Sequence, residues 1–196
     1  MSHMDRMSRF TMSDTSIAGL KCIERQVLGD VRGSLSRLFC AQDLAQAGWH
    51  GAIAQINLTA TAKKGTVRGL HFQKPPHAEM KLVSCLRGEV WDLAVDLRAN
   101  SPTFLNWHAE ILSAQNYRAL LIPEGFAHGF QALSDDVEML YCHSMPYHAQ
   151  ADSGRNPLDP RLAIAWPLPV ALLSARDRAH PLLNAETSPD FEGVRL

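Results

Sequence analysis

His71 is the residue whose side chain is best suited to chemistry, and it lies in the middle of the strand-like run of residues 66–73. Side chains alternate along a strand, so His71 shares a face with Gly69, and Arg68 lies on the opposite face. A glycine beside an imidazole lets a ligand approach closely. The alternative is a core histidine that is hydrogen-bonded to a neighbour. If Arg68 and His71 contact one ligand, the strand must twist or bulge near Gly69.

Lys81, Tyr141 and Asp177 each have a structural and a chemical interpretation. Lys81 opens an apolar strand, either as an exposed strand end or as an inward cation that stabilises a developing oxyanion. Tyr141 is either a core ring with a bonded hydroxyl or an acid. Asp177, on a predicted late helix, looks like a solvated charge. Taken one at a time, each residue favours the structural interpretation.

A second histidine, His128, follows Pro123 and Gly125 in the pattern Pro-x-Gly-x-x-His. This pattern resembles the second motif of the cupins, which are small double-stranded β-helix proteins. Metal-binding cupins also need an upstream His-x-His and a glutamate, whereas Phe72 and Gln73 follow the first histidine. Two histidines without a suitably spaced carboxylate make a poor site for a first-row metal. We therefore expect no metal.

The elements that must position these residues are predicted to be short β-strands. Turn signals separate them, which favours a sandwich or barrel over βαβ units. The predicted strands are residues 20–28, a second strand through residue 39, and then 52–58, 66–73, 80–86, 89–97, 105–112, 119–122, 127–133 and 137–143. Residues 41–47, ended by Gly48, and residues 172–178 are predicted helices, and residues 162–166 resume the apolar pattern. Asp92 and Asp96 form an acidic stripe that is functional if it faces inward and merely solvated if it faces outward.

Length and composition favour one domain over residues 17–196, because 196 residues with 46% hydrophobic content can build one full core. Residues 1–16 are expected to lie outside the fold, and the first four resemble an expression remnant. A net charge of −1 with scattered basic residues predicts no nucleic-acid binding. The sequence has no apolar run of membrane-spanning length, so a cytoplasmic protein without membrane contact is expected. Four widely spaced cysteines in apolar contexts indicate reduced thiols.

Considered together, the motifs resemble the dTDP-4-dehydrorhamnose 3,5-epimerase (RmlC-like) family. The resemblance spans about residues 20–183 and is most specific over residues 66–130. The matching segments, in order, are residues 68–73, 81–83, 87–96, 101–104, 112–114, 122–130 and 173–177. The resemblance implies an all-β, cupin-type jelly roll with short peripheral helices. It also implies a homodimeric isomerase without metal or organic cofactor, acting on nucleotide-linked 4-keto-6-deoxy sugars.

The resemblance also implies a role for each residue. His71 would be the general base that removes the proton next to the C4 ketone, and Asp177 would pair with it. Lys81 would hold the enolate oxygen, and Tyr141 would return a proton from the opposite face, provided that Lys81 or a water network lowers its pKa. Such chemistry needs a base near neutrality and a donor at the developing charge. Predicted substrate-binding residues are Arg68, His128, Asp92, Arg32, Arg37, Gln55, Asn57, Gln73 and Tyr147.

The sequence departs from the family pattern at Arg37, which stands where a glutamate is expected. A guanidinium only donates hydrogen bonds, so it suits cytosine better than the thymine imide, and the nucleotide is left open between dTDP, CDP and another nucleotide. Loop differences leave open inversion at C3, at C5 or at both. A cupin that only binds a sugar nucleotide and a metal-dependent cupin enzyme are the alternative functions. Four chemical groups retained together favour catalysis over binding alone.

Overall fold

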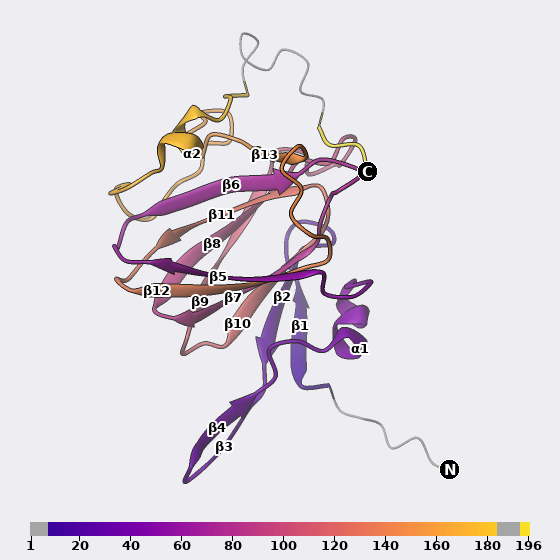
Figure 1. Ribbon diagram of the computed structural model, residues 1–196, viewed down its shortest axis with the longest axis vertical. Helices are drawn as coiled ribbons and strands as arrows, with labels where there is room; N and C mark the ends of the chain where they lie inside the picture. Colours follow the sequence, from indigo (N-terminus) through magenta and orange to yellow (C-terminus); the bar gives the residue numbers. More distant parts are fainter. Residues whose placement is uncertain (1–7, 184–192) are drawn as a thin grey trace.

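The computed structural model describes residues 8–183 and 193–196, in which two antiparallel sheets pack face to face (Figure 1). One sheet has the order β1 (Phe10–Asp14), β2 (Lys21–Arg25), β10 (Arg118–Ile122), β7 (Lys81–Arg87), β12 (Val137–His143) and β5 (Gln55–Thr61). The other has the order β13 (Asp152–Gly154), β6 (Val67–Gln73), β11 (Phe126–Ala132), β8 (Glu89–Asp96) and β9 (Trp107–Ser113). The predicted all-β, cupin-type jelly roll is confirmed.

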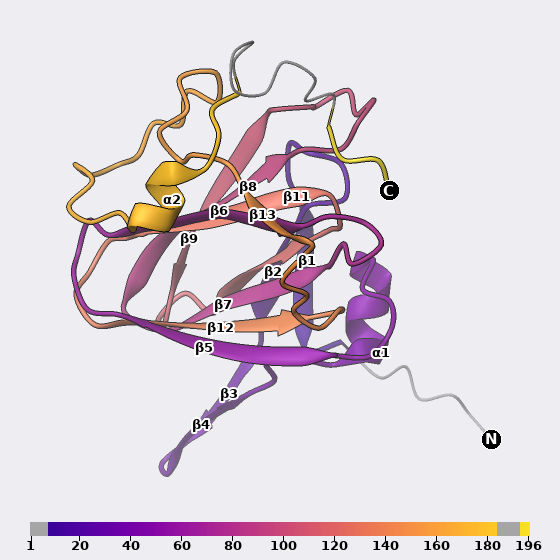
Figure 2. The same cartoon turned by 45° about the horizontal axis from the view of Figure 1, so that its top comes forward.

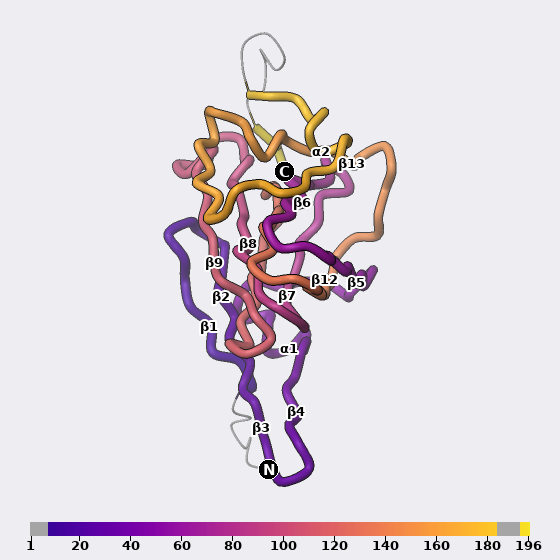
Figure 3. The backbone as a smooth tube through the Cα atoms, turned by 90° about the vertical axis from the view of Figure 1, so that its left-hand side faces the viewer, coloured from indigo at the N-terminus to yellow at the C-terminus, as the bar shows by residue number. Residues whose placement is uncertain are grey.

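A hairpin and two short helices complete the fold. The hairpin, β3 (Val27–Asp30) and β4 (Gly33–Ser36), projects away from the sandwich as a separate two-stranded arm (Figure 3). Helix α1 (Ala41–Leu44) continues into the 3₁₀ turn η1 (Ala45–Ala47), and Gly48 ends it with a φ of 103°. Helix α2 (Ala175–Ala179) lies against β6 (Figure 2). None of the helices in the described ranges is long and apolar enough to cross a membrane.

The apolar core lies between the two sheets, because alternate residues of each strand point inward. Strands β7, β10 and β12 contribute from one side, and β8 and β11 from the other. Central members of this core are Val83, Leu120, Met139, Val90, Ala94, Phe126 and Phe130. The outer face of the five-stranded sheet is also covered, by apolar residues of the chain beyond β13 such as Leu162, Leu183 and Val194. The sandwich is therefore a rigid frame for side chains at its open end.

The eight strands predicted between residues 52 and 143 all form, with ends displaced by a few residues. Two expectations were wrong. Residues 10–14 form β1, although we expected residues 1–16 to lie outside the fold, because Phe10 is buried and the strand pairs with β2. Residues 20–28 divide into two strands, of which the second belongs to the arm. The apolar residues of 162–166 pack on the five-stranded sheet. Residues 1–7 lie outside the described range, and one domain over residues 17–196 stays a prediction.

Candidate active site

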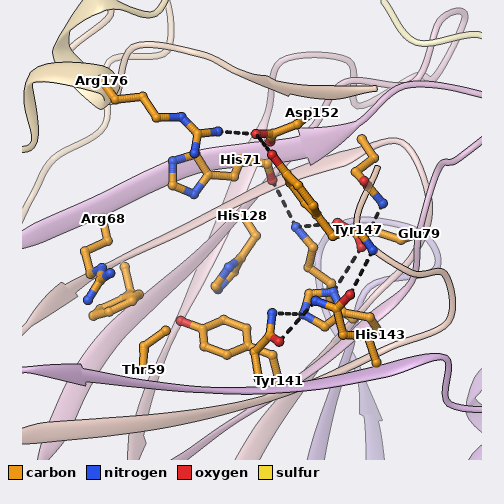
Figure 4. Close-up of a pocket in the computed structure, with 15 residues that line it drawn as sticks. Thr59, Arg68, His71, Glu79, His128, Tyr141, His143, Tyr147, Asp152 and Arg176 are labelled. Carbon is orange, nitrogen blue, oxygen red and sulfur yellow. Dashed lines mark hydrogen bonds and ion pairs between the residues drawn. The ribbon is translucent and has the colours of Figure 1, made fainter. Parts of the chain in front are cut away.

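A polar pocket opens between β5 and β12 on one side and β6 and β11 on the other (Figure 4). Helix α2 and the loop after β12 complete its rim. The pocket is lined by Gln55, Asn57, Thr59, Arg68, His71, Gln73, Glu79, Lys81, His128, Phe130, Tyr141, His143, Tyr147, Asp152 and Arg176. All four predicted catalytic positions meet at this pocket, since Asp177 lies directly behind His71.

Strand β6 brings Arg68 and His71 to the same pocket through an irregularity at Gly69. The β6–β11 register shifts between His128 and Phe130, which lie opposite His71 and Arg68. Gly69 has a φ of 130°, and an added Cβ would lie 2.5 Å from the Gly129 Cα. Only a residue without a side chain fits such a contact between two backbones. The strand therefore has the irregularity near Gly69 that is required if Arg68 and His71 are to contact one ligand.

His71 and Asp177 form a hydrogen-bonded dyad. The His71 Nε2 lies 2.7 Å from Asp177 Oδ1, and Asp177 Oδ2 accepts the Gly69 N–H at 3.3 Å. Ser174 caps α2 by accepting the Asp177 N–H, which fixes the carboxylate against β6. Burial acts to raise the pKa of Asp177, but the hydrogen bond and charge of His71 outweigh it and lower that pKa. An ionised carboxylate therefore orients the imidazole and fixes its tautomer.

Lys81 points into the pocket, so it is not an exposed strand end. Its side chain is 8% exposed, and its Nζ donates to the His71 carbonyl at 3.2 Å. The Glu79 carboxylate, also buried, lies 3.1 Å from the same nitrogen. The ammonium is thus held beside the dyad, where it can stabilise negative charge on a bound molecule.

Tyr141 and His128 occupy the floor of the pocket. Their rings meet edge to face with centroids 5.8 Å apart, and His128 Nε2 lies 2.8 Å from Asp92 Oδ1. Burial, with the Asp92 charge, raises the pKa of Tyr141, so its hydroxyl stays protonated at neutral pH. The hydrogen bond to Thr59 and the charge of Arg68 act to lower this pKa, but burial outweighs them. A lowering by Lys81 or by a water network stays a prediction. Figure 4 shows the Tyr141 hydroxyl pointing toward Thr59.

Polar side chains at the rim form a connected row. Gln55 donates to the Asn57 Oδ1 at 3.0 Å and accepts the Tyr147 N–H at 2.8 Å. The Tyr147 hydroxyl donates to Asp152 at 3.2 Å, and Arg176 donates to the same carboxylate. Tyr147 is 58% exposed, so its ring is free to contact a ligand.

The remaining predicted binding residues differ in position. Gln73 lines the pocket, but its amide is taken up by Glu79, two backbone carbonyls and the His148 N–H. Asp92 does not line the pocket, because it is fully buried behind His128, and the acidic stripe therefore faces inward. Arg32 lies on the exposed arm beside Asp30, and Arg37 donates to Asp43 at 3.0 Å. Neither arginine lines the pocket of its own chain.

Several pocket residues were not predicted from the sequence. Thr59 and His143 lie two positions from Asn57 and Tyr141 on the same strands, so strand alternation places them on the same faces. Alternation along these two strands was therefore sufficient to predict them. Asp152 and Arg176 come from a short edge strand and from α2, and only the folded chain brings them to the rim.

One group of side chains resembles a metal-ligand set. The potential ligand atoms of His71, Asp177 and His180 lie within 4.8 Å of one another. Tetrahedral zinc with ligands at about 2.1 Å needs ligand atoms roughly 3.4 Å apart, and the His71–Asp177 pair is already closed by a hydrogen bond. The arrangement fits a catalytic dyad better than a metal centre, and the absence of a metal stays a prediction.

Comparison with known proteins gives the family. The family model described as dTDP-4-dehydrorhamnose 3,5-epimerase matches residues 14–185. The chain belongs to this family. A dTDP-4-dehydrorhamnose 3,5-epimerase from Sinorhizobium fredii (strain NBRC 101917 / NGR234) is 40% identical over 182 residues, which cover 92% of this chain and 93% of the relative. As a member of the 3,5-epimerase family, the protein is an isomerase of the epimerase class.

Two solved structures of related epimerases resemble this chain closely. One is dTDP-6-deoxy-D-glucose-3,5-epimerase RmlC from Legionella pneumophila Philadelphia 1 in complex with dTDP-4-keto-L-rhamnose, with a TM-score of 0.87 and 40% identity over 95% of this chain and 98% of that one. The other is ChmJ, a 3'-monoepimerase from Streptomyces bikiniensis in complex with dTDP-quinovose, with a TM-score of 0.84 and 33% identity over 94% of this chain and 92% of that one. These relatives support epimerisation rather than the two alternative functions.

Proposed function

We propose that the protein inverts C3 and C5 of a dTDP-linked 4-keto-6-deoxy sugar through an enolate. The observation that carries this proposal is the His71–Asp177 dyad, with the Lys81 ammonium hydrogen-bonded to the His71 carbonyl in the same pocket. A C–H beside a ketone is weakly acidic, so its removal requires a base and a cation at the oxygen where charge develops. This pocket supplies both.

The reaction follows from the hydrogen bonds already described. Asp177 holds His71 Nε2, so Nδ1 takes the proton from the carbon next to the ketone. The C–H electron pair moves into the enolate, and the Lys81 ammonium stabilises the negative oxygen. Tyr141, kept protonated by burial, then gives its proton to the opposite face of that carbon, which inverts the centre. Arg68 binds the pyrophosphate, and His128, oriented by Asp92, contacts the sugar.

Inversion at both carbons is supported by the 3,5-epimerase relatives, whereas ChmJ is a 3'-monoepimerase. The assay is solvent deuterium uptake at each carbon, followed by NMR of the sugar. Deuterium at both C3 and C5 is expected. Uptake at one carbon alone would make the protein a single-carbon epimerase.

The choice of dTDP is supported by the ligand of the Legionella relative. CDP was favoured by Arg37 alone, and the guanidinium of this residue is engaged by Asp43 outside the pocket. A ligand that binds only the native state raises the apparent stability. Thermal shifts with dTDP, CDP, GDP and UDP should therefore be largest for dTDP. A larger shift with CDP would refute the choice of dTDP and favour recognition of cytosine by Arg37.

The roles of the catalytic residues are tested with His71→Ala, which should abolish deuterium uptake. The matched control is His108→Ala, since His108 also pairs with a carboxylate, Glu110 at 3.0 Å, but lies outside the pocket. The control should retain full activity. Retained exchange in His71→Ala would exclude this histidine as the base.

We also propose that the enzyme is a cytoplasmic homodimer. Strand β5 is an edge strand that exposes Ile56 and Leu58, each about 60% exposed, and an exposed apolar edge favours pairing with a second copy. Sedimentation should show a dimer, and Leu58→Glu should shift it toward monomer. A monomeric wild type would refute this assignment. Four free cysteines suit the reducing cytoplasm.

A further inference from the structure

Glu79 is a pocket carboxylate with a buried side chain for which the proposed reaction has no role. Its side chain is 8% exposed and accepts three hydrogen bonds. Lys81 Nζ lies 3.1 Å from Oε1, while His143 Nδ1 at 3.0 Å and Gln73 Nε2 at 3.2 Å share Oε2. A buried carboxylate surrounded by donors on both oxygens is held in one orientation. Its position is therefore as well defined as that of Asp177.

The same contacts make Glu79 a poor base. Burial acts to raise its pKa, but the hydrogen bond from His143 and the charge of Lys81 outweigh burial and lower that pKa. A carboxylate accepts only, so His143 must donate through Nδ1, and its Nε2 faces the Asn57 amide at 3.4 Å. Glu79 is thus ionised at neutral pH, and its lone pairs are directed at Lys81, His143 and Gln73.

Glu79 is the carboxylate in direct contact with the Lys81 ammonium. The ammonium is buried, and removing a counter-charge from a buried ion is costly. Around it, β6 contributes His71, β11 contributes His128, and β12 contributes Tyr141 and His143. Strand β8 contributes Asp92, whose pKa is raised by burial. Within residues 8–183 and 193–196, Glu79 is the carboxylate that forms an ion pair with Lys81.

We propose that Glu79 is a positioning residue that holds the Lys81 ammonium beside the reacting ketone, with His143 fixing the second oxygen of Glu79. The inference rests on the proposed enolate chemistry, in which Lys81 stabilises the oxyanion. Glu79 acts through Lys81 and does not touch the reacting atoms. The substrate oxygen then meets a cation whose place is set before binding, as electrostatic stabilisation requires.

The test compares wild type with Glu79→Gln, which keeps the shape of the side chain and removes its charge. Without the carboxylate, the ammonium is no longer held beside the ketone, so kcat should fall about tenfold or more. KM should change less than kcat. The matched control is Glu110→Gln, because Glu110 also contacts a histidine and a cation, His108 and Arg118, outside the pocket. The control should keep the wild-type kcat and KM.

A second readout does not depend on activity. The chain has five lysines, so ¹³Cε labelling gives few resonances, and Lys81→Arg identifies the one from Lys81. The order parameter of this methylene group should be lower in Glu79→Gln than in wild type, because Lys81 loses its ion pair, whether or not the wild type epimerises the proposed substrate. Equal order parameters would overturn the inference. An inactive wild type with the lower order parameter in Glu79→Gln would overturn the proposed function alone.

Glu79→Asp separates charge from position and covers the case in which Glu79→Gln does not fold. The shorter carboxylate retains the charge but withdraws it from Lys81 or from His143. We expect kcat to fall about tenfold or more although the charge is retained, because the ammonium is displaced from the ketone. Full activity in Glu79→Asp would refute the positioning role.

Discussion

Replacing Gly69 with alanine should reveal how strongly the pocket depends on the contact between β6 and β11. The new Cβ would lie 2.5 Å from the Gly129 Cα and 2.8 Å from the His128 carbonyl oxygen. Both neighbours are backbone atoms that cannot rotate away, so the strands must separate by about 1 Å to restore ordinary contact. The residue also has a φ of 130°, which disfavours any side chain.

The expected loss of stability is the sum of two effects. Overpacking in a closed site costs about 1 to 3 kcal/mol. A positive φ costs an alanine roughly 1 to 2 kcal/mol more. Gly69→Ala should therefore reduce the free energy of unfolding by about 2 to 5 kcal/mol. Separation of the strands also displaces His71 from His128, and a misplacement near 1 Å can reduce catalysis about 100-fold.

The assay is urea unfolding at neutral pH, with Gly48→Ala as the matched control. Gly48 has a φ of 103°, but an added Cβ would meet nothing within 4 Å. The control should lose only the backbone part, about 1 to 2 kcal/mol, and should stay fully active. Equal losses of unfolding free energy in the two variants would refute the idea that steric contact between the β6 and β11 backbones shapes the pocket.

Three further predictions concern the charged residues and the acid. Asp177→Asn should slow deuterium uptake about 10- to 100-fold, a barrier increase of about 1.4 to 2.7 kcal/mol; full activity would show that His71 needs no carboxylate. Tyr141→Phe should lower kcat about 100-fold or more while proton abstraction by His71 continues, so the substrate should exchange its proton without inversion, and normal inversion would exclude Tyr141 as the acid. The lowered pKa values of Glu79 and Asp177 stabilise the fold above the ordinary carboxyl pKa of about 4, and this stability is lost as pH falls through the lower folded values. The urea midpoint of wild type should thus fall between pH 5 and pH 2, and that of Glu79→Gln should fall less; parallel curves would show that this carboxylate is not stabilised in the fold.

The sequence predicted local features where one strand or one turn is sufficient. Alternation in the strands between residues 52 and 143 identified each strand, because a buried face imposes a period of two. Gly48 ended the early helix, since a left-handed residue is readily adopted by glycine. The prediction of the N-terminus failed, because residues 10–14 have no periodic pattern of their own. Pairing with β2 and burial of Phe10 make them a strand.

The sequence motifs by themselves also determined which residues could carry acid-base chemistry, namely His71, Lys81, Tyr141 and Asp177. Only the tertiary structure decided whether those groups meet. Asp177 follows His71 by 106 positions and looked like a solvated charge, whereas the packing of α2 on β6 brings its carboxylate to the imidazole. Glu79 lies 3.1 Å from the Lys81 ammonium, and burial of both side chains strengthens this ion pair by removing water from the charges. Residue types and spacing define which chemistry the side chains could carry. Proximity and desolvation, which set how strongly these groups interact, exist only in the folded chain.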